Sequence, residues 1–143
     1  MTFLRRGFAM AAVALCFMAV PAAAQDFKVI VNSANGVTEL SAAVTLKIFL
    51  KEVTKFPNGT ASTLIDQNKA SSVRAAFSKT VIGRPVTAVK TFWQQQLFSG
   101  KELPPAVKAS DDDVVAFVKA TPGGIGYVSA GANVVGVKVI DVK

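Results

Sequence analysis

The 143-residue sequence contains no histidine and only one cysteine, Cys16. The missing histidine excludes Ser-His and Cys-His nucleophile pairs and removes the commonest metal ligand. Because Cys16 lies in an N-terminal apolar run, the rest of the chain has no disulfide and no thiolate metal site. Glu39, Glu52 and Glu102 are isolated in sequence, so no acid–base pair is visible. The residue types therefore predict a non-enzymatic protein with no catalytic residues, no metal site and no cofactor.

The N-terminal segment has the order of a secretory signal peptide. Arg5 and Arg6 precede an apolar run of 14 residues, and Ala22–Ala24 supplies an A-x-A cleavage site. A transmembrane anchor is the alternative, but the run is shorter than the ~20 residues that a membrane span needs. We therefore expect residues 1–24 to be a signal peptide, and the mature chain of residues 25–143 to form one compact domain in the periplasm.

Acidic residues are scarce. Without the two leader arginines, the mature chain carries 14 basic and 9 acidic residues, a net charge of +5. Its lysines are scattered singly and no aromatic residues interleave a basic run, which argues against nucleic-acid binding. A modest cationic excess instead favours a small anion or an acidic protein surface as the partner.

Alternating β-branched residues and three-to-four apolar spacing predict a mixture of strands and helices. Ser41 and Ser110 are expected to cap helices, with Asp113 at the reciprocal position of a capping box. A calcium cluster is the alternative interpretation of the acidic run 111–113. Strands are expected over residues 27–33, 61–66, 125–130 and 137–143, and helices over 42–55, 71–83, 86–98 and 111–120. This order predicts an α/β or mixed α+β layer structure. The expected core comprises Val29, Val31, Val44, Ile48, Phe77, Trp93, Phe117, Ile125 and Val139.

Five strings, in order, are typical of one family: LSAAVTLKIFLKEVTKFPNGT, SSVRAAF, FWQQQLFSGKELPP, SDDDVVAFVKATPGGIGYV and VKVIDV. Together they resemble the periplasmic phosphate-binding-protein-like (PBP-like) family, related to the substrate-binding protein of the phosphate ABC importer. The resemblance covers nearly all of residues 25–143. It implies an α/β type II binding-protein-like fold, with a mixed sheet flanked by helices, and a solute-binding role in ABC-type transport.

Two departures from the family pattern affect the expected function. Full family members close two lobes on their ligand, whereas this chain is long enough for a single lobe. The family's Ser-Gly-Thr is replaced by Ser71-Ser72-Val73, which removes the glycine that lets the backbone approach an oxyanion closely.

The segment ASSVRAAF, residues 70–77, leaves two interpretations open. In the first, Ser71, Ser72 and Arg74 bind phosphate or a similar small oxyanion, because hydroxyls and a planar guanidinium suit such a ligand. In the second, a serine only caps the helix and Arg74 points to water or to Asp66. The chain would then be an interaction module that docks to a membrane transport or sensor complex.

Overall fold

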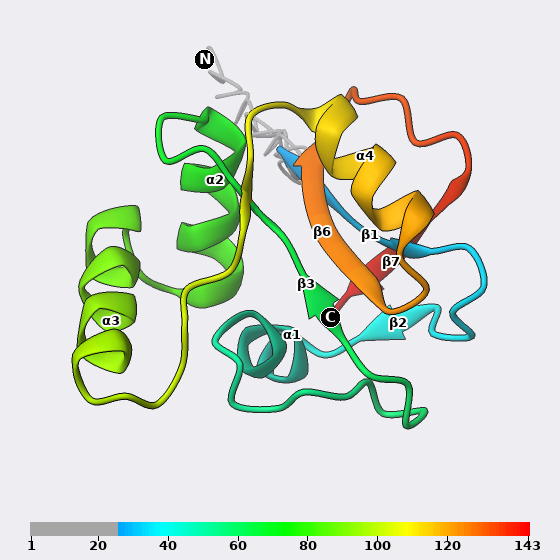
Figure 1. The fold of residues 1–143 in the computed structure, drawn as a ribbon. Coiled ribbons are helices and arrows are strands. Elements are labelled where there is room, and N and C mark those ends of the chain that lie inside the picture. Colours follow the sequence, from blue (N-terminus) through cyan, green and yellow to red (C-terminus); the bar gives the residue numbers. More distant parts are fainter. Residues whose placement is uncertain (1–25) are drawn as a thin grey trace, which may run out of the picture.

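The computed structural model describes residues 26–143 (Figure 1). The predicted signal peptide therefore lies outside the described residues. Within them, no helix has the length and apolarity needed to cross a membrane. The strands are β1 (Phe27–Asn32), β2 (Glu39–Leu40), β3 (Thr63–Leu64), β4 (Asp66–Gln67), β5 (Val107–Lys108), β6 (Gly124–Ser129) and β7 (Val137–Val142). The helices are α1 (Ala42–Phe49), α2 (Ser72–Phe77), a π-helical turn η1 (Ser78–Ile82), α3 (Val86–Phe98) and α4 (Asp111–Ala120).

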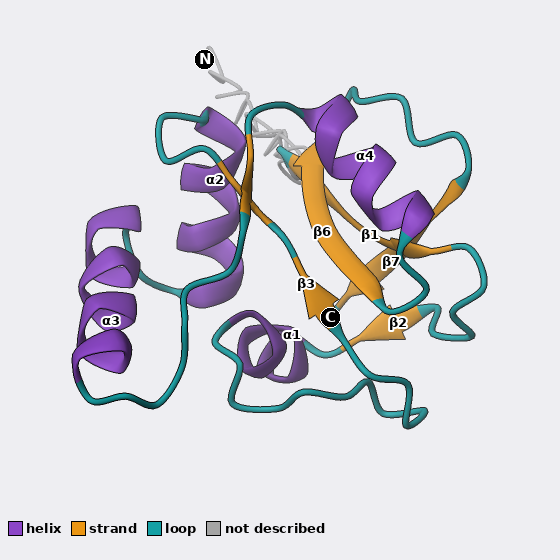
Figure 2. Cartoon of the chain, in the orientation of Figure 1, coloured by secondary structure: helices purple, strands orange, loops and turns teal. Residues whose placement is uncertain are grey.

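Five strands form a mixed sheet in the order β2-β7-β1-β6-β3 (Figure 2). β1 pairs antiparallel with both β6 and β7, whereas β2 and β3 run parallel to their neighbours β7 and β6. A second, two-stranded parallel sheet joins β4 to β5. The predicted α/β fold, a mixed sheet flanked by helices, is confirmed, while the short strands β2 and β5 were not predicted.

The predicted helix caps are confirmed. Ser41 Oγ accepts from the Val44 amide at 3.1 Å, and Ser110 Oγ accepts from the Asp113 amide at 3.2 Å. The helix predicted over residues 42–55 is too long, because α1 ends at Phe49. The chain then turns at a left-handed backbone angle, φ 55°, two residues later. An α-helix cannot continue through that conformation.

The helix predicted over residues 71–83 is divided between α2 and η1. It ends at Gly83, whose φ of 73° is the left-handed conformation that favours glycine at a helix C-terminus. η1 places Val81 in the core. It packs against α1 and also contacts α3.

The core lies on both faces of the sheet. One cluster joins β1, β6, α1, α2 and η1 through buried aromatic and aliphatic side chains, among them Phe27, Phe49, Phe77, Ile125 and Tyr127. The other lies beneath α4 and comprises Ile30, Ile65, Val114, Val118 and Val128. The single lobe therefore has a hydrophobic core on each side of one sheet.

Six of the nine expected core residues are buried: Val29, Val31, Ile48, Phe77, Trp93 and Ile125. Val44 and Phe117 are only half-buried and pack against the edges of the two clusters. The expectation for Val139 is wrong, because its side chain is 41% exposed. α4 packs mainly on β1 and β6, so Val139 on β7 lies beyond the helix.

Glycines at the start of β6 allow close packing and do not form a phosphate loop. A Cβ on Gly123 would lie 2.0 Å from the carbonyl oxygen of Ala61. A Cβ on Gly126 would lie 2.7 Å from Val114 Cγ1 and 2.9 Å from Ile65 Cγ2. These close approaches make a tight packing corner between α4 and β6.

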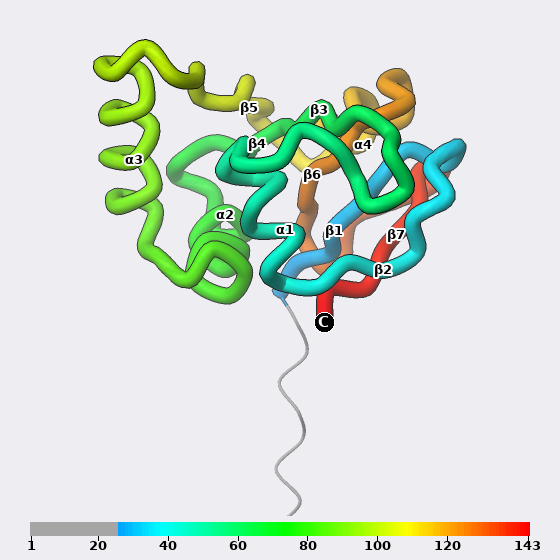
Figure 3. Tube along the Cα trace, turned by 90° about the horizontal axis from the view of Figure 1, so that it is seen from below, coloured from blue at the N-terminus to red at the C-terminus, as the bar shows by residue number. Residues whose placement is uncertain are grey.

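α3 lies at one end of the molecule, away from the sheet, in both Figure 1 and Figure 3. Its main packing partner is η1. Val89 and Trp93 are its buried residues. α3 lies beside α2, and a groove next to Arg74 separates the two helices.

Candidate functional site

The predicted oxyanion segment runs from β4 through a turn into α2. The Ala70 amide donates to Asn68 Oδ1 at 3.0 Å, and the Ser71 amide donates to the Asn68 carbonyl at 2.8 Å. Ser71 occupies the N-cap position of α2, yet its hydroxyl donates to Gln67 Oε1 at 3.2 Å and does not cap the helix. Ser72, the next residue, is exposed.

The Arg74 guanidinium lies against β4. Its Nη2 is 3.1 Å from Asp66 Oδ2, and its Nη1 donates to the Gln67 carbonyl at 2.8 Å. The side chains of Arg74 and Asp66 are each only 12% exposed. The second interpretation of the sequence is therefore confirmed for Arg74, which pairs with Asp66. It is not confirmed for Ser71, whose side chain does not cap the helix. Most of the charge of Arg74 is balanced within the protein.

Asp66 also accepts two further hydrogen bonds. The Tyr127 hydroxyl and the Gln67 amide both donate to Asp66 Oδ1, the latter at 2.8 Å. Burial raises the pKa of Tyr127, and the negative charge of Asp66 raises it further. The phenol therefore stays protonated and acts as a donor. The carboxylate of Asp66 is held by an arginine, a tyrosine and a backbone amide.

The network continues to the first turn of α4. Gln67 Nε2 donates to Asp111 Oδ1 at 2.7 Å and to the Tyr127 carbonyl at 2.9 Å. The Ser129 amide donates to Asp111 Oδ1 at 3.1 Å. Burial pushes the pKa of Asp111 upward, but the hydrogen bonds from Gln67 and Ser129 outweigh it and hold the pKa below its ordinary value. Asp111 thus ties α4 to β6 and β4.

We expect acid to remove the stabilisation that Asp111 provides. The pKa of Asp111 is lower in the folded chain than in the unfolded chain, so this contribution is present above the unfolded pKa and is lost as the pH falls through the folded pKa. Asp111→Ala should lower the free energy of unfolding by about 1.5 kcal/mol at pH 7. In this variant the free energy of unfolding should also depend less on pH below about pH 4. Urea titrations between acidic and neutral pH measure both effects.

Asp112→Ala is the matched control, because it removes the same charge from the same turn of α4 without these hydrogen bonds. Equal losses of stability in the two variants would show that the charge at the helix end matters and the network does not.

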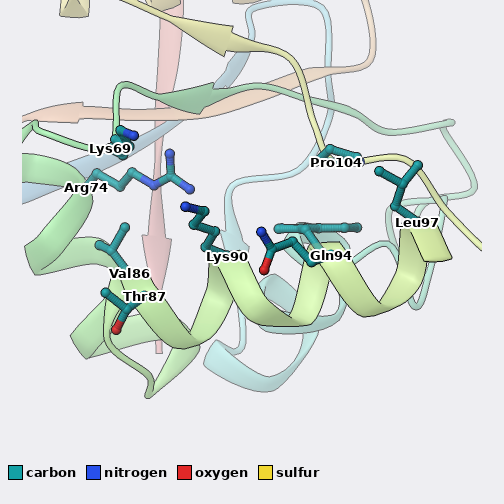
Figure 4. Close-up of a pocket in the computed structure, with 9 residues that line it drawn as sticks. Lys69, Arg74, Val86, Thr87, Lys90, Gln94, Leu97 and Pro104 are labelled. Atoms are coloured by element: carbon teal, nitrogen blue, oxygen red, sulfur yellow. The ribbon is translucent and has the colours of Figure 1, made fainter.

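A pocket of about 550 Å³ opens beside Arg74, between α2 and α3 (Figure 4). Its lining residues are Lys69, Arg74, Val86, Thr87, Lys90, Trp93, Gln94, Leu97 and Pro104. Figure 4 shows the side chains of Lys69, Arg74 and Lys90 together at one end, with Leu97 and Pro104 at the other. The pocket therefore has a cationic end and an apolar end.

The three predicted site residues are close in the chain but have different surroundings. Ser71 and Arg74 both contact Gln67, and Arg74 alone lines the pocket. Sequence reasoning missed Lys90, which reaches the pocket from α3. It also missed Lys69, although this cation stands only two residues before Ser71 and could have been noticed.

Two comparisons with known proteins bear on the family and the fold. The family model described as "PBP superfamily domain" matches residues 5–139. No curated protein matches the sequence.

Solved structures match the fold at low identity. An ABC-type phosphate transport receptor from Vibrio cholerae is 18% identical with a TM-score of 0.62, over 82% of this chain and 46% of that one. PstS from Borrelia burgdorferi is 15% identical with a TM-score of 0.64, over 82% and 47%. A structure from Clostridium perfringens that holds bound phosphate is 15% identical with a TM-score of 0.63, over 82% and 44%. This chain thus spans less than half the length of these proteins, and its fold is that of one lobe.

Proposed function

Because the chain belongs to the PBP superfamily, we propose that it is an exported, non-catalytic binding module. Its ligand in this proposal is phosphate or a similar small oxyanion, held by Ser71, Ser72 and Arg74. The relatives named above include phosphate transport receptors, which suggests a role in ABC-type transport. The observation that carries the proposal is the convergence of three cationic side chains beside this segment.

The charge balance around the pocket supports an anionic ligand. Asp66 balances Arg74, but Lys69 and Lys90 take part in no ion pair within the described part of the chain. An oxyanion at this end would meet two ammonium groups and the remaining N–H donors of the guanidinium. The Arg74–Asp66 pair also fixes the guanidinium in place, which lowers the entropy lost on binding.

The proposal includes no chemical step. The sequence has no histidine, and its one cysteine lies in the predicted leader. The buried Tyr127 is held as a hydrogen-bond donor to Asp66, with a raised pKa that does not suit a general base near neutral pH. Binding without turnover is therefore the activity that the site residues favour.

A second candidate is an interaction module with no small ligand. The outer end of α3 and the loop after it expose three large apolar side chains: Leu97 is 51% exposed, Phe98 89% and Leu103 64%. Such a cluster is a common feature of protein-docking surfaces. A membrane transport complex or a sensor domain would be the partner in this case.

Calorimetry with phosphate, arsenate and sulfate tests the first proposal. One lobe leaves part of the ligand in water, so we expect a dissociation constant on the order of 1 mM for phosphate. Binding should weaken as salt is added, because the contacts are charged. Ser72→Gly removes a Cβ beside the site and lets the backbone approach the anion, so affinity should hold or rise.

Ser110→Gly is the control, because it changes a serine at the start of α4, where Ser110 accepts from the Asp113 amide. It should cost a few tenths of a kcal/mol in stability and leave phosphate affinity unchanged. If wild type and Ser72→Gly show no heat of binding with any of the three anions, the interaction-module proposal replaces the first.

A further inference from the structure

Most of the pocket beside Arg74 is not built for an inorganic anion. Val86, Trp93, Leu97 and Pro104 line it together with the three cationic residues. Apolar walls offer no hydrogen bonds to a hydrated tetrahedral anion. They are typical of sites that bury the body of an organic ligand. The pocket volume of about 550 Å³ lies within the range of small-molecule sites.

The charged groups of the pocket are separated from Leu97 and Pro104, although Val86 and Thr87 lie beside the cationic end. The cationic side chains gather at one end, while Leu97 and Pro104 lie at the other (Figure 4). None of the lining residues in the described chain is acidic. A ligand that fits this arrangement has one anionic head and one apolar body, because burying a charge against the apolar end would be unfavourable.

We infer that the pocket binds an organic oxyanion, with its phosphonate or carboxylate head at Lys69, Arg74 and Lys90 and its apolar body against Trp93 and Leu97. This inference rests on the proposed anion-binding function and narrows its substrate class. An aryl or short alkyl body would lie between the cationic end and Pro104.

Trp93 provides a direct signal for this ligand. It is the only tryptophan in the sequence, it lines the pocket, and its side chain is largely buried. Lys51 Nζ lies 5.9 Å from its ring centroid, which adds a cation–π contact to the indole. A body that packs against the ring should change the intrinsic fluorescence, whereas inorganic phosphate at the cationic end should change it little.

The experiment compares phenylphosphonate, inorganic phosphate and the neutral benzyl alcohol, each titrated into the mature protein by calorimetry and Trp93 fluorescence. Phenylphosphonate should bind about tenfold more tightly than phosphate, because its ring buries apolar surface in the groove. Benzyl alcohol should bind more weakly than either anion, because it lacks the charged head.

Two variants with matched controls locate the two halves of the ligand. Leu97→Ser should lower the affinity for phenylphosphonate about threefold or more and leave the affinity for phosphate unchanged. Val135→Ser changes an exposed apolar residue outside the pocket and should alter neither affinity. Lys90→Gln should lower the affinity for both anions about threefold. Lys55→Gln, outside the pocket, should leave both affinities unchanged. Leu97 and Lys90 are both exposed, so the fold should survive these changes.

The inference is overturned if phenylphosphonate binds no more tightly than phosphate, if Leu97→Ser affects both anions equally, or if benzyl alcohol binds as well as phenylphosphonate. Phosphate binding with no preference for the aryl anion would leave the proposed function standing. If neither anion binds, both the inference and the proposed anion site are wrong.

Discussion

Replacing Arg74 with alanine is expected to lower the free energy of unfolding by about 3 kcal/mol, the cost typical of breaking a buried ion pair. The change leaves the carboxylate of Asp66 buried without its counter-charge, next to the Tyr127 hydroxyl. It also removes the hydrogen bond from Arg74 to the Gln67 carbonyl, which links α2 to β4. Urea denaturation followed by the fluorescence of Trp93 measures the loss.

Arg84→Ala is the matched control, because Arg84 is exposed in the loop before α3. It should change stability by less than about 0.5 kcal/mol. In the double variant Arg74→Ala, Asp66→Asn, part of the loss should be recovered, because the uncompensated charge is gone. Equal, small effects of Arg74→Ala and Arg84→Ala would show that the Arg74–Asp66 pair does not stabilise the fold, and that Arg74 is free for a ligand.

Phe77→Ala should be the most destabilising single substitution in the core, at about 3–5 kcal/mol. Phe77 is 1% exposed and connects α2 to the sheet. Its ring stacks on that of Tyr127 at a centroid distance of 4.0 Å, and it lies 4.6 Å from Phe49 and 5.4 Å from Phe27. Removing the ring leaves a cavity bordered by three aromatic side chains, which cannot collapse without moving two helices or the sheet.

Phe98→Ala is the control at the same residue type, because Phe98 is 89% exposed at the end of α3. It should change the free energy of unfolding by less than about 0.5 kcal/mol. Thermal and urea unfolding of the two variants give the comparison. A loss below about 1 kcal/mol for Phe77→Ala would contradict the aromatic cluster as the centre of the lobe.

The local parts of this fold could be predicted from the sequence because their signals are local. Ser41 and Ser110 cap their helices as expected, since a cap depends on a backbone amide three residues away. The end of α1 could not be predicted in this way. Apolar residues continue past Phe49, but a left-handed backbone angle at Lys51, a non-glycine residue, ends the helix.

The polar network could be predicted only in part. Asp66 was a plausible neighbour of Arg74 because the two residues are only eight positions apart in the sequence. The hydrogen bonds of Gln67 with Asp111 and of Tyr127 with Asp66 span 44 and 61 residues. Such pairs depend on how α4 and β6 pack against β4, and no local pattern in the sequence carries that information.

The pocket likewise depends on the tertiary fold. Lys69 and Arg74 come from the segment around α2, while Lys90, Trp93 and Leu97 come from α3. Helical spacing places the α3 residues near one another, but only the packing of α3 on η1 brings them to face Arg74.

A phosphate titration of the isotopically labelled protein, followed by amide chemical shifts, tests the central claim most directly. Saturable shifts for residues 69–74 and for Lys90, with a dissociation constant on the order of 1 mM and a clear dependence on salt, are the expected result. Lys55, which lies outside the pocket, should not shift. If none of these amides moves at tens of millimolar phosphate, the chain does not hold an oxyanion at Ser71, Ser72 and Arg74.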